Sequence, residues 1–151
     1  KQVSDNTDWG VLMLFGGGIA LSNVLKVSGA SLVLGETVAN GLQTAPLLVV
    51  MLAISAFIIF LTEFASNTAS AALLVPVFAA IAEYMGIPSE VLVLIIGIGA
   101  SCAFMLPVAT PPNAIVFGTG LIKQTEMVRT GVILNIISTV IVGCWAYFFL
   151  L

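Results

Sequence analysis

Two polar segments interrupt an otherwise apolar sequence, and their residue types are suited to binding ions. Residues 62–70 read TEFASNTAS, and residues 106–113 read LPVATPPN. Free backbone carbonyls and helix C-terminal ends suit Na⁺, whereas the amides at helix N-termini suit an anionic carboxylate. The hydroxyl and amide side chains of these segments therefore predict a pocket for a cation, an anion, or both.

Composition excludes most other chemistry and most other environments. The chain of 151 residues contains no His, which removes the commonest general base and the commonest metal ligand. Only 7% of its residues are charged and 60% are hydrophobic, whereas a soluble domain carries roughly 25% charged residues. A net charge of −3 without a basic patch argues against nucleic-acid binding. We therefore expect an integral membrane protein that is neither an enzyme nor a partner of nucleic acid.

The uncharged stretches are long enough to cross a bilayer as helices, which need about 17–25 apolar residues. They cover residues 9–25, 37–62, 64–82, 91–122 and 130–151. Apolar runs such as 49–54 do not alternate with polar residues, as the strands of a membrane barrel do. The sequence therefore predicts an all-α integral membrane fold.

The first part of the chain, residues 1–44, predicts a scaffold-type transmembrane helix followed by an interfacial helix. The span runs from Trp9 to about Ser28, with Trp9 at one membrane interface and Lys26 reaching the other. Residues 29–43 are weakly amphipathic and too short to cross, so we expect them to lie along the membrane surface.

A re-entrant helical hairpin is predicted next, over residues 45–86. Apolar residues run from Pro46 to Leu61, and they resume after the polar segment 62–70. The second arm, of about 14 residues, is in the length range of a re-entrant segment. We therefore expect both arms to enter and leave on the same side of the membrane. This hairpin begins the predicted half of a transport domain, residues 45–151.

A broken transmembrane helix follows over residues 88–122. Its first half is expected to run from Glu90 to Met105 and to stop where prolines remove backbone donors. The helix restarts with Pro112 in its first turn and continues to about Ile122. A polar loop from Lys123 to Arg129 then precedes the last transmembrane helix.

That last helix is expected over residues 130–151, and the basic residues predict its orientation. Lys1, Lys123 and Arg129 would share one side of the membrane, with Lys26 on the other. The positive-inside rule places the side with three basic residues in the cytoplasm. The hairpin then enters from outside a multi-pass protein of the cell inner (plasma) membrane.

The two polar segments are expected to meet at mid-membrane. Lipid cannot hydrogen-bond an open backbone, so broken segments survive only when they are buried in protein or line a watery cavity. An acid within the membrane is a functional candidate by default, but a negative charge at Glu63 would repel an anionic substrate. We therefore favour a structural role for Glu63, either hydrogen-bonded near the hairpin tip or reaching a water-filled cavity.

The same two segments resemble a known family. Thr62-Glu63-Phe64 followed by Ser66-Asn67-Thr68, together with LPVATPPNAIVF at 106–117, is similar to the divalent-anion/sodium symporters, whose bacterial dicarboxylate members are called INDY transporters. The resemblance covers essentially the whole chain, as the C-terminal inverted repeat of that fold. In this family, an SNT tip in each of two hairpins contacts substrate carboxylates, and each hairpin pairs with a broken helix around one Na⁺.

The resemblance implies site residues on this chain. Its substrate contacts would be Ser66, Asn67, Thr68, Thr110 and Pro111. Its sodium ligands would be Thr62, Ala65, Asn67 and Ala109, partly through backbone carbonyls. The family's other hairpin and broken helix are absent here, so this chain alone would hold half a site.

The implied function is sodium-coupled uptake of C4-dicarboxylates such as succinate, by an elevator-type alternating-access mechanism. Sulfate and tricarboxylates are alternative substrates within the family. The implied partners are Na⁺, the dicarboxylate, the lipid membrane, the N-terminal inverted-repeat half of the transporter and a second copy in a homodimer. Two other classes remain open: a channel whose filter is the re-entrant hairpin, and a structural membrane subunit without a transport role.

Overall fold

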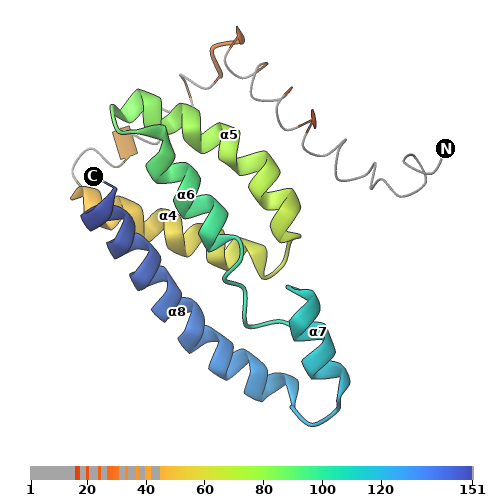
Figure 1. The fold of residues 1–151 in the computed structure, drawn as a ribbon. Coiled ribbons are helices and arrows are strands. Elements are labelled where there is room, and N and C mark those ends of the chain that lie inside the picture. Colours follow the sequence, from red (N-terminus) through yellow and green to blue (C-terminus); the bar gives the residue numbers. More distant parts are fainter. Residues whose placement is uncertain are drawn as a thin grey trace, which may run out of the picture.

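The computed structural model describes residues 45–150 without a gap and, before them, residues 16, 17, 20, 24, 27–30, 33, 37, 40 and 41. The first span and the interfacial helix predicted for residues 1–44 lie outside the continuously described part. Within residues 45–150, the chain forms five α-helices and no strand (Figure 1). They are α4 (Leu47–Thr62), α5 (Asn67–Met85), α6 (Ser89–Gly99), α7 (Pro111–Gly118) and α8 (Gln124–Phe149).

Helices α4 and α5 form a hairpin whose ends follow from local sequence. Pro46 precedes α4, where its missing N–H costs no helical hydrogen bond. Ser66 caps α5, because its hydroxyl accepts a hydrogen bond from the Ala69 N–H at 3.4 Å. Gly86 ends α5 with a φ of 71°, a left-handed conformation that glycine adopts without steric cost.

The second arm of the hairpin is longer than expected. Helix α5 has 19 residues and, like α8 with 26, is long and apolar enough to cross a membrane. The prediction of about 14 residues was wrong because Ser66 lets helix begin at Asn67, inside the polar segment. By length alone α5 is not restricted to a re-entrant path, so the path of the hairpin stays a prediction.

The first half of the broken helix ends earlier than predicted. Helix α6 stops at Gly99, six positions before Met105, and residues 102–104 are non-helical. The first proline after α6 is Pro107, too late to explain this end, although Gly97 and Gly99 weaken the last turn of the helix. The N–H groups of residues 104–106 instead donate to a side chain that directly follows α4, and this distant acceptor replaces the helical carbonyls.

The second half of the broken helix and the start of the last helix also differ from expectation. Helix α7 ends at Gly118 rather than near Ile122, and Gly120 turns the chain with a φ of 71°. The predicted polar loop 123–129 is wrong, because α8 already begins at Gln124. The Glu126 carboxylate accepts from the Lys123 N–H at 3.2 Å, so polar residues here stabilise a helix start.

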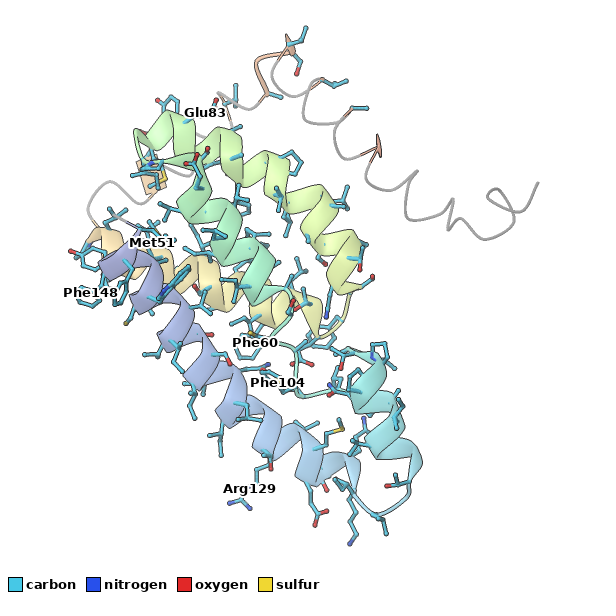
Figure 2. All side chains as sticks on the ribbon, in the orientation of Figure 1. Met51, Phe60, Glu83, Phe104, Arg129 and Phe148 are labelled. Carbon is cyan, nitrogen blue, oxygen red and sulfur yellow. The ribbon has the colours of Figure 1, made fainter. Side chains whose placement is uncertain are left out.

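The helices pack around one apolar core. Helix α4 packs against both α8 and α6, and α5 packs on the other side of α6 (Figure 1). Met51, which Figure 2 labels, belongs to this core with fully buried isoleucines of α4 and α6 and with Leu92 of α6. The outward face of α8 is also apolar, and its exposed members are Ile133, Ile136, Ile137, Val140 and Ile141. An apolar exposed face on a helix long enough to span is what a lipid-facing helix requires.

Candidate functional site

The hairpin tip and the break in the broken helix meet beside the middle of α8. Helix α4 ends at Thr62, the tip covers residues 63–66, and the break covers residues 100–110. Phe104, labelled in Figure 2, lies in the break next to α8. Both predicted polar segments are therefore in one region of the molecule, as the sequence indicated.

Glu63 makes the connection between these segments. Its side chain is fully buried, and its Oε1 accepts hydrogen bonds from the N–H groups of Phe104 at 2.7 Å and Met105 at 2.9 Å. Its Oε2 accepts from the Leu106 N–H at 3.0 Å. One carboxylate thus satisfies three successive amides that the break removes from helical pairing. The expected structural role of Glu63, hydrogen-bonded near the hairpin tip, is confirmed by these contacts.

Asn135 brings α8 into the same network. Its Nδ2 donates to Glu63 Oε1 at 2.6 Å, and its Oδ1 accepts from the Phe104 N–H at 3.3 Å. Both side chains are fully buried. The two basic residues within 45–150, Lys123 and Arg129, are exposed. Hydrogen-bond donors, rather than those basic groups, therefore compensate the buried carboxylate.

The opposite edge of the break is held by Asn113 from α7. Its Nδ2 donates to the carbonyls of Ala103 at 3.1 Å and Leu106 at 3.0 Å. The Thr110 hydroxyl accepts from the Asn113 N–H at 3.3 Å and so caps α7. The non-helical backbone therefore has three of its N–H groups paired on the hairpin side and two of its carbonyls paired on the α7 side.

The predicted sodium ligands differ in what they can offer. Thr62 is buried, and its hydroxyl donates into its own helix, to the carbonyls of Ile58 at 3.0 Å and Ile59 at 3.1 Å. Ala65 is exposed at the tip, and Ala109 lies in the break, where its N–H donates to the Leu106 carbonyl at 3.2 Å. The oxygen of Thr62 most suited to a cation is therefore its carbonyl, at the helix C-terminus.

Asn67 is the predicted ligand with a free oxygen. Its Oδ1 is buried and has no hydrogen-bond partner among the residues that the structure describes. A buried acceptor left unpaired is costly, and in a native protein such an atom calls for a bound water, an ion or a function. An amide oxygen is a hard ligand, so the residues at this tip fit Na⁺.

The predicted substrate residues lie at two helix N-termini. Ser66, Asn67 and Thr68 are at the start of α5, and Thr110 and Pro111 are at the start of α7. Ser66, Thr68 and Pro111 are exposed, whereas Asn67 and Thr110 are half-buried. The hydrogen bonds that connect the hairpin to the break are made by Glu63, which is not among the predicted ligands.

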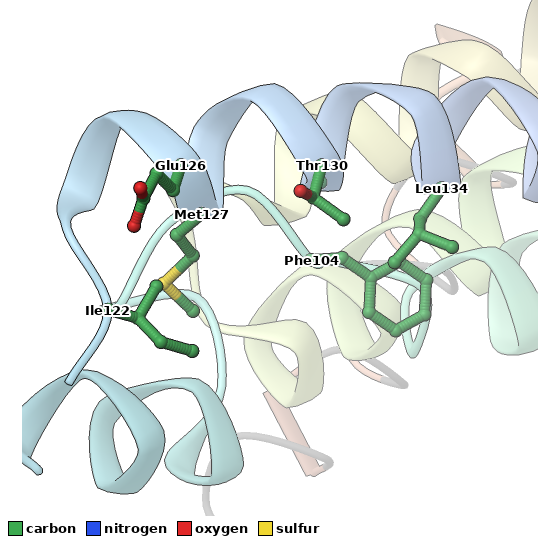
Figure 3. Close-up of a pocket in the computed structure, with 7 residues that line it drawn as sticks. Phe104, Ile122, Glu126, Met127, Thr130 and Leu134 are labelled. Atoms are coloured by element: carbon green, nitrogen blue, oxygen red, sulfur yellow. The ribbon is translucent and has the colours of Figure 1, made fainter.

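A pocket lies on another side of the break and is a poor substrate site. Its volume is about 360 Å³, and Figure 3 shows it between the break, the end of the α7 segment and the start of α8. Its lining is Phe104, Ile122, Glu126, Met127, Thr130, Gly131 and Leu134. This lining is mostly apolar and its one ionisable group is an acid, which would repel an anion.

Asn135 and Asn113 were missed as functional candidates from the sequence. Asn135 is the one side-chain amide between Gly131 and Leu151, in a stretch expected to cross the membrane. A polar side chain in such a stretch is a signal for a buried partner, and it could have marked Asn135 as a candidate without identifying that partner. Asn113 was part of the quoted motif, but its pairing depends on the fold of the break.

Comparison with known proteins supports a transporter family. The model of a family described as "Sodium:sulfate symporter transmembrane region" matches residues 1–150. An uncharacterized transporter of Haemophilus influenzae is 60% identical over 149 residues, which cover 99% of this chain and 32% of that protein. The sodium-dependent dicarboxylate transporter SdcS of Staphylococcus saprophyticus is 42% identical over 147 residues, covering 97% of this chain and 28% of the relative.

A more distant organism carries a similar protein. An uncharacterized transporter of Methanocaldococcus jannaschii is 40% identical over 143 residues, 95% of this chain and 32% of the relative. The chain thus spans about a third of the length of the relatives it matches, whereas we expected it to be one of two halves of a transporter. These names are names of transporters, in keeping with the expectation that the chain is not an enzyme. On the match over residues 1–150 and the high identity over nearly its whole length, this chain belongs to the sodium:sulfate symporter family, the divalent-anion/sodium symporters that its two polar segments resemble.

Proposed function

We propose that this chain is the C-terminal inverted repeat of a sodium-coupled symporter for C4-dicarboxylates such as succinate, in the cell inner membrane. The observation that carries the proposal is the buried, unpartnered Oδ1 of Asn67 at the hairpin tip. The family match and the relatives named as sodium-dependent transporters support the same coupling ion.

The proposed sodium site takes its oxygens from both polar segments. Asn67 would supply its side-chain oxygen, and Thr62, Ala65 and Ala109 would supply backbone carbonyls. The end of α4 suits this role, because the last carbonyls of a helix lack helical partners and carry partial negative charge. The Na⁺ would be a co-transported ion, so it has to be released at each turnover.

The proposed substrate site faces the starts of α5 and α7. Ser66, Asn67 and Thr68 would contact one carboxylate, and Thr110 and Pro111 would lie beside it. The Thr110 oxygen accepts from the Asn113 N–H, which leaves its O–H able to donate to a substrate oxygen. Helix N-termini favour negative charge, so the site can bind an anion without a Lys or Arg nearby.

A dicarboxylate is favoured over sulfate by one comparison. The relative that is 42% identical is named as a dicarboxylate transporter, although the family description names sulfate. Sulfate and tricarboxylates stay as alternatives. Competition for Na⁺-driven uptake separates them, since only the true substrate class displaces labelled succinate at concentrations near its own KM.

The geometry of α8 supports a re-entrant path for the hairpin. Helix α8 has 26 residues, which gives a length of about 39 Å at about 1.5 Å per residue. Asn135, which holds the hairpin tip, lies roughly 17 Å from the start of α8 by the same rise. If α8 crosses the bilayer, the tip reaches mid-depth. Both outer ends of the hairpin lie near the C-terminal end of α8 in Figure 1.

We take the moving body to be the hairpin, the broken helix and α8 together. An elevator mechanism requires that these parts travel as a unit past a fixed scaffold, in a dimer as the family resemblance implies. The hydrogen bonds from Glu63 to the break and to Asn135 support such a unit, because they tie all three parts at one point.

The test is Asn67→Ala in the full-length protein, reconstituted in liposomes. We expect loss of Na⁺-driven succinate uptake and a weaker Na⁺ dependence of substrate binding, because the cation loses its side-chain ligand. Thr125→Ala, at an exposed position in the first turn of α8, is the control and should behave like the parent.

Three results would contradict the proposal. Parental uptake by Asn67→Ala and Thr110→Ala together would favour a structural subunit. Uptake that neither saturates nor exchanges would favour a channel. Equal uptake by the parent with and without a Na⁺ gradient would show that transport is not coupled to Na⁺.

A further inference from the structure

Glu63 and Asn135 lie between two groups of residues that the proposed function brings together. Glu63 follows Thr62 directly and lies two positions before Ala65 and four before Asn67, so three of the four proposed sodium ligands lie in the hairpin tip or next to it. The fourth, Ala109, is on the other segment. The distance between Ala109 and the other three ligands is therefore set by contacts between the hairpin and the break.

A direct path between the two groups runs through Leu106. Glu63 Oε2 accepts from the Leu106 N–H at 3.0 Å. The carbonyl of that same residue accepts from the Ala109 N–H at 3.2 Å and from Asn113 Nδ2 at 3.0 Å. The position of Leu106 therefore decides where the Ala109 turn and the start of α7 stand relative to the hairpin tip.

Backbone and amide donors already satisfy most of the Glu63 carboxylate, without a cation. Oε1 already accepts from Phe104, Met105 and Asn135, and Oε2 accepts from Leu106. Three successive N–H groups directed at one anion form a backbone nest, and here the anion is the protein's own carboxylate. The Glu63 carboxylate is hydrogen-bonded to the backbone of the break, so we expect it to act on a bound ligand by positioning that backbone.

Asn135 orients the carboxylate from the third element. It donates to Glu63 Oε1 at 2.6 Å and accepts from the Phe104 N–H at 3.3 Å, so it touches both partners of the main contact. Because α8 is long and continuous, this contact fixes the depth of the tip along α8. A side chain that only filled space would need neither hydrogen bond.

We propose that Glu63 and Asn135 are positioning residues that hold the sodium ligands of the hairpin and of the break in register before Na⁺ arrives. This inference depends on the proposed function. Loss of the network separates Ala109 from Thr62, Ala65 and Asn67, so Na⁺ has to reorganise the break in order to bind. Apparent Na⁺ affinity falls, and substrate affinity at saturating Na⁺ changes much less.

The experiment uses Glu63→Gln, Asn135→Asp and their combination in the purified full-length protein. The first change places an amide N–H2 opposite a backbone N–H, and the second places another carboxylate beside Glu63. In the double variant, the amide introduced on the hairpin can donate to the carboxylate introduced on α8, and one carboxylate again faces the break. Na⁺ affinity is read from the Na⁺ dependence of the thermal unfolding temperature and of intrinsic fluorescence, and succinate KM is measured at low and at saturating Na⁺.

The expected result is a loss of Na⁺ affinity of at least tenfold in each single variant. The double variant should recover at least half of that loss on a logarithmic scale, and succinate KM at saturating Na⁺ should stay within about threefold of the parent in all three. Glu126→Gln, which changes an exposed glutamate at the start of α8, is the matched control and should bind Na⁺ like the parent.

A purely structural role gives a different result. The variants would then unfold at lower temperature without Na⁺, but the folded protein would bind Na⁺ with parental affinity, and that overturns the proposal. Equal losses in the double and single variants also overturn it. Should Glu63→Gln not accumulate, Asn135→Ser keeps the three backbone donors on Glu63; weaker Na⁺ affinity supports the proposal and parental affinity contradicts it.

Failure of the proposed function remains distinguishable. If Na⁺ does not stabilise the parent protein, the parent has no sodium site, and the proposed function is wrong. Asn67→Ala should lose Na⁺ affinity through loss of a ligand, and the exchange between positions 63 and 135 should not restore it. Na⁺ binding by the parent with unchanged binding in the Glu63 and Asn135 variants would overturn only this inference.

Discussion

Gly131 has no room for a side chain, because the break lies directly against α8 at this position. A Cβ at Gly131 would stand 2.5 Å from both the Met105 Cα and the Phe104 carbonyl oxygen. These are backbone atoms of the segment that Glu63 holds from the other side. At the scale of single residues, the site is therefore confined by main-chain atoms that cannot turn away as a flexible side chain can.

Gly131→Ala should consequently destabilise the protein by about 1–3 kcal/mol, the usual cost of overpacking a core. Gly143→Ala is the matched control on the same helix. Its Cβ would meet the Leu52 Cδ2 at 2.7 Å, which can move aside, and the Leu52 Cα at 3.1 Å, a looser main-chain contact than those at Gly131, so a smaller loss is expected. Thermal unfolding of the full-length protein measures both, and equal shifts in the two variants would contradict the prediction.

Thr110 and Pro111 should fail in different ways. Thr110→Val removes the hydroxyl that caps α7 and would contact substrate, so succinate affinity should weaken by roughly 1–3 kcal/mol. Thr110→Ser keeps the hydroxyl and should bind like the parent. Pro111→Ala lets helix propagate into the break, so it should weaken Na⁺ binding as well. Parental succinate binding by Thr110→Val would show that residues 109–111 are structural.

At the scale of elements, local signals predicted helix boundaries well where a cap or a proline decides them. The end of α4 near Leu61 and the restart of helix at the paired prolines agree with expectation. The predicted end of α6 was wrong by six residues. The backbone after α6 pairs with Glu63, which lies 41 residues before Phe104 in sequence. The start of α8 was wrong because polar residues at a helix start resemble a loop.

The candidate site follows the same division. Its two polar segments and the Asn67 side chain could be identified from sequence, because polar and broken backbone is so unusual in an apolar chain. The partners of Glu63 and Asn135 could not, since these hydrogen bonds join segments that are 31–72 residues apart in sequence. The contacts of Asn113 could not either, because they depend on how the break folds. Sequence composition carries no information on such a meeting point.

The orientation of these elements in the membrane is open to direct measurement. A cysteine at Ser89, where α6 begins, should react with an impermeant reagent from outside the cell. A cysteine at Gln124, where α8 begins, should react only from inside. The background should have Cys102 and Cys144 replaced by Ala. Labelling of both positions from the same face would mean that the hairpin spans or that the broken helix does not.

At the scale of the whole molecule, charge decides how an anion can be bound. The described residues place neither Lys nor Arg at the tip or in the break, and the buried acid there is already paired with amides. A dianion therefore depends on helix N-termini and on co-bound cations for compensation. Transport of the anion and of Na⁺ would then be linked by electrostatics rather than by a moving gate alone.

Substrate and Na⁺ should consequently raise each other's affinity by the same factor, about 5-fold or more. Succinate dissociation constants measured in Na⁺ and in choline give one side of this comparison. Na⁺ dissociation constants measured with and without succinate give the other. Equal succinate affinity in the two salts would contradict the coupling, and unequal factors would indicate that the protein was not at equilibrium.

The long separation within the network also has a consequence for biosynthesis. Glu63 enters the membrane 41 residues before its first backbone partner and 72 residues before Asn135. At about 5–20 residues per second, translation reaches Asn135 roughly 4–14 s after Glu63. Until residues 104–106 have been made, the new hairpin holds an unpaired acid, which is costly in lipid, and Asn135 completes its hydrogen bonds later. The hairpin tip therefore gains its contact with the last helix only after Asn135 has been synthesised.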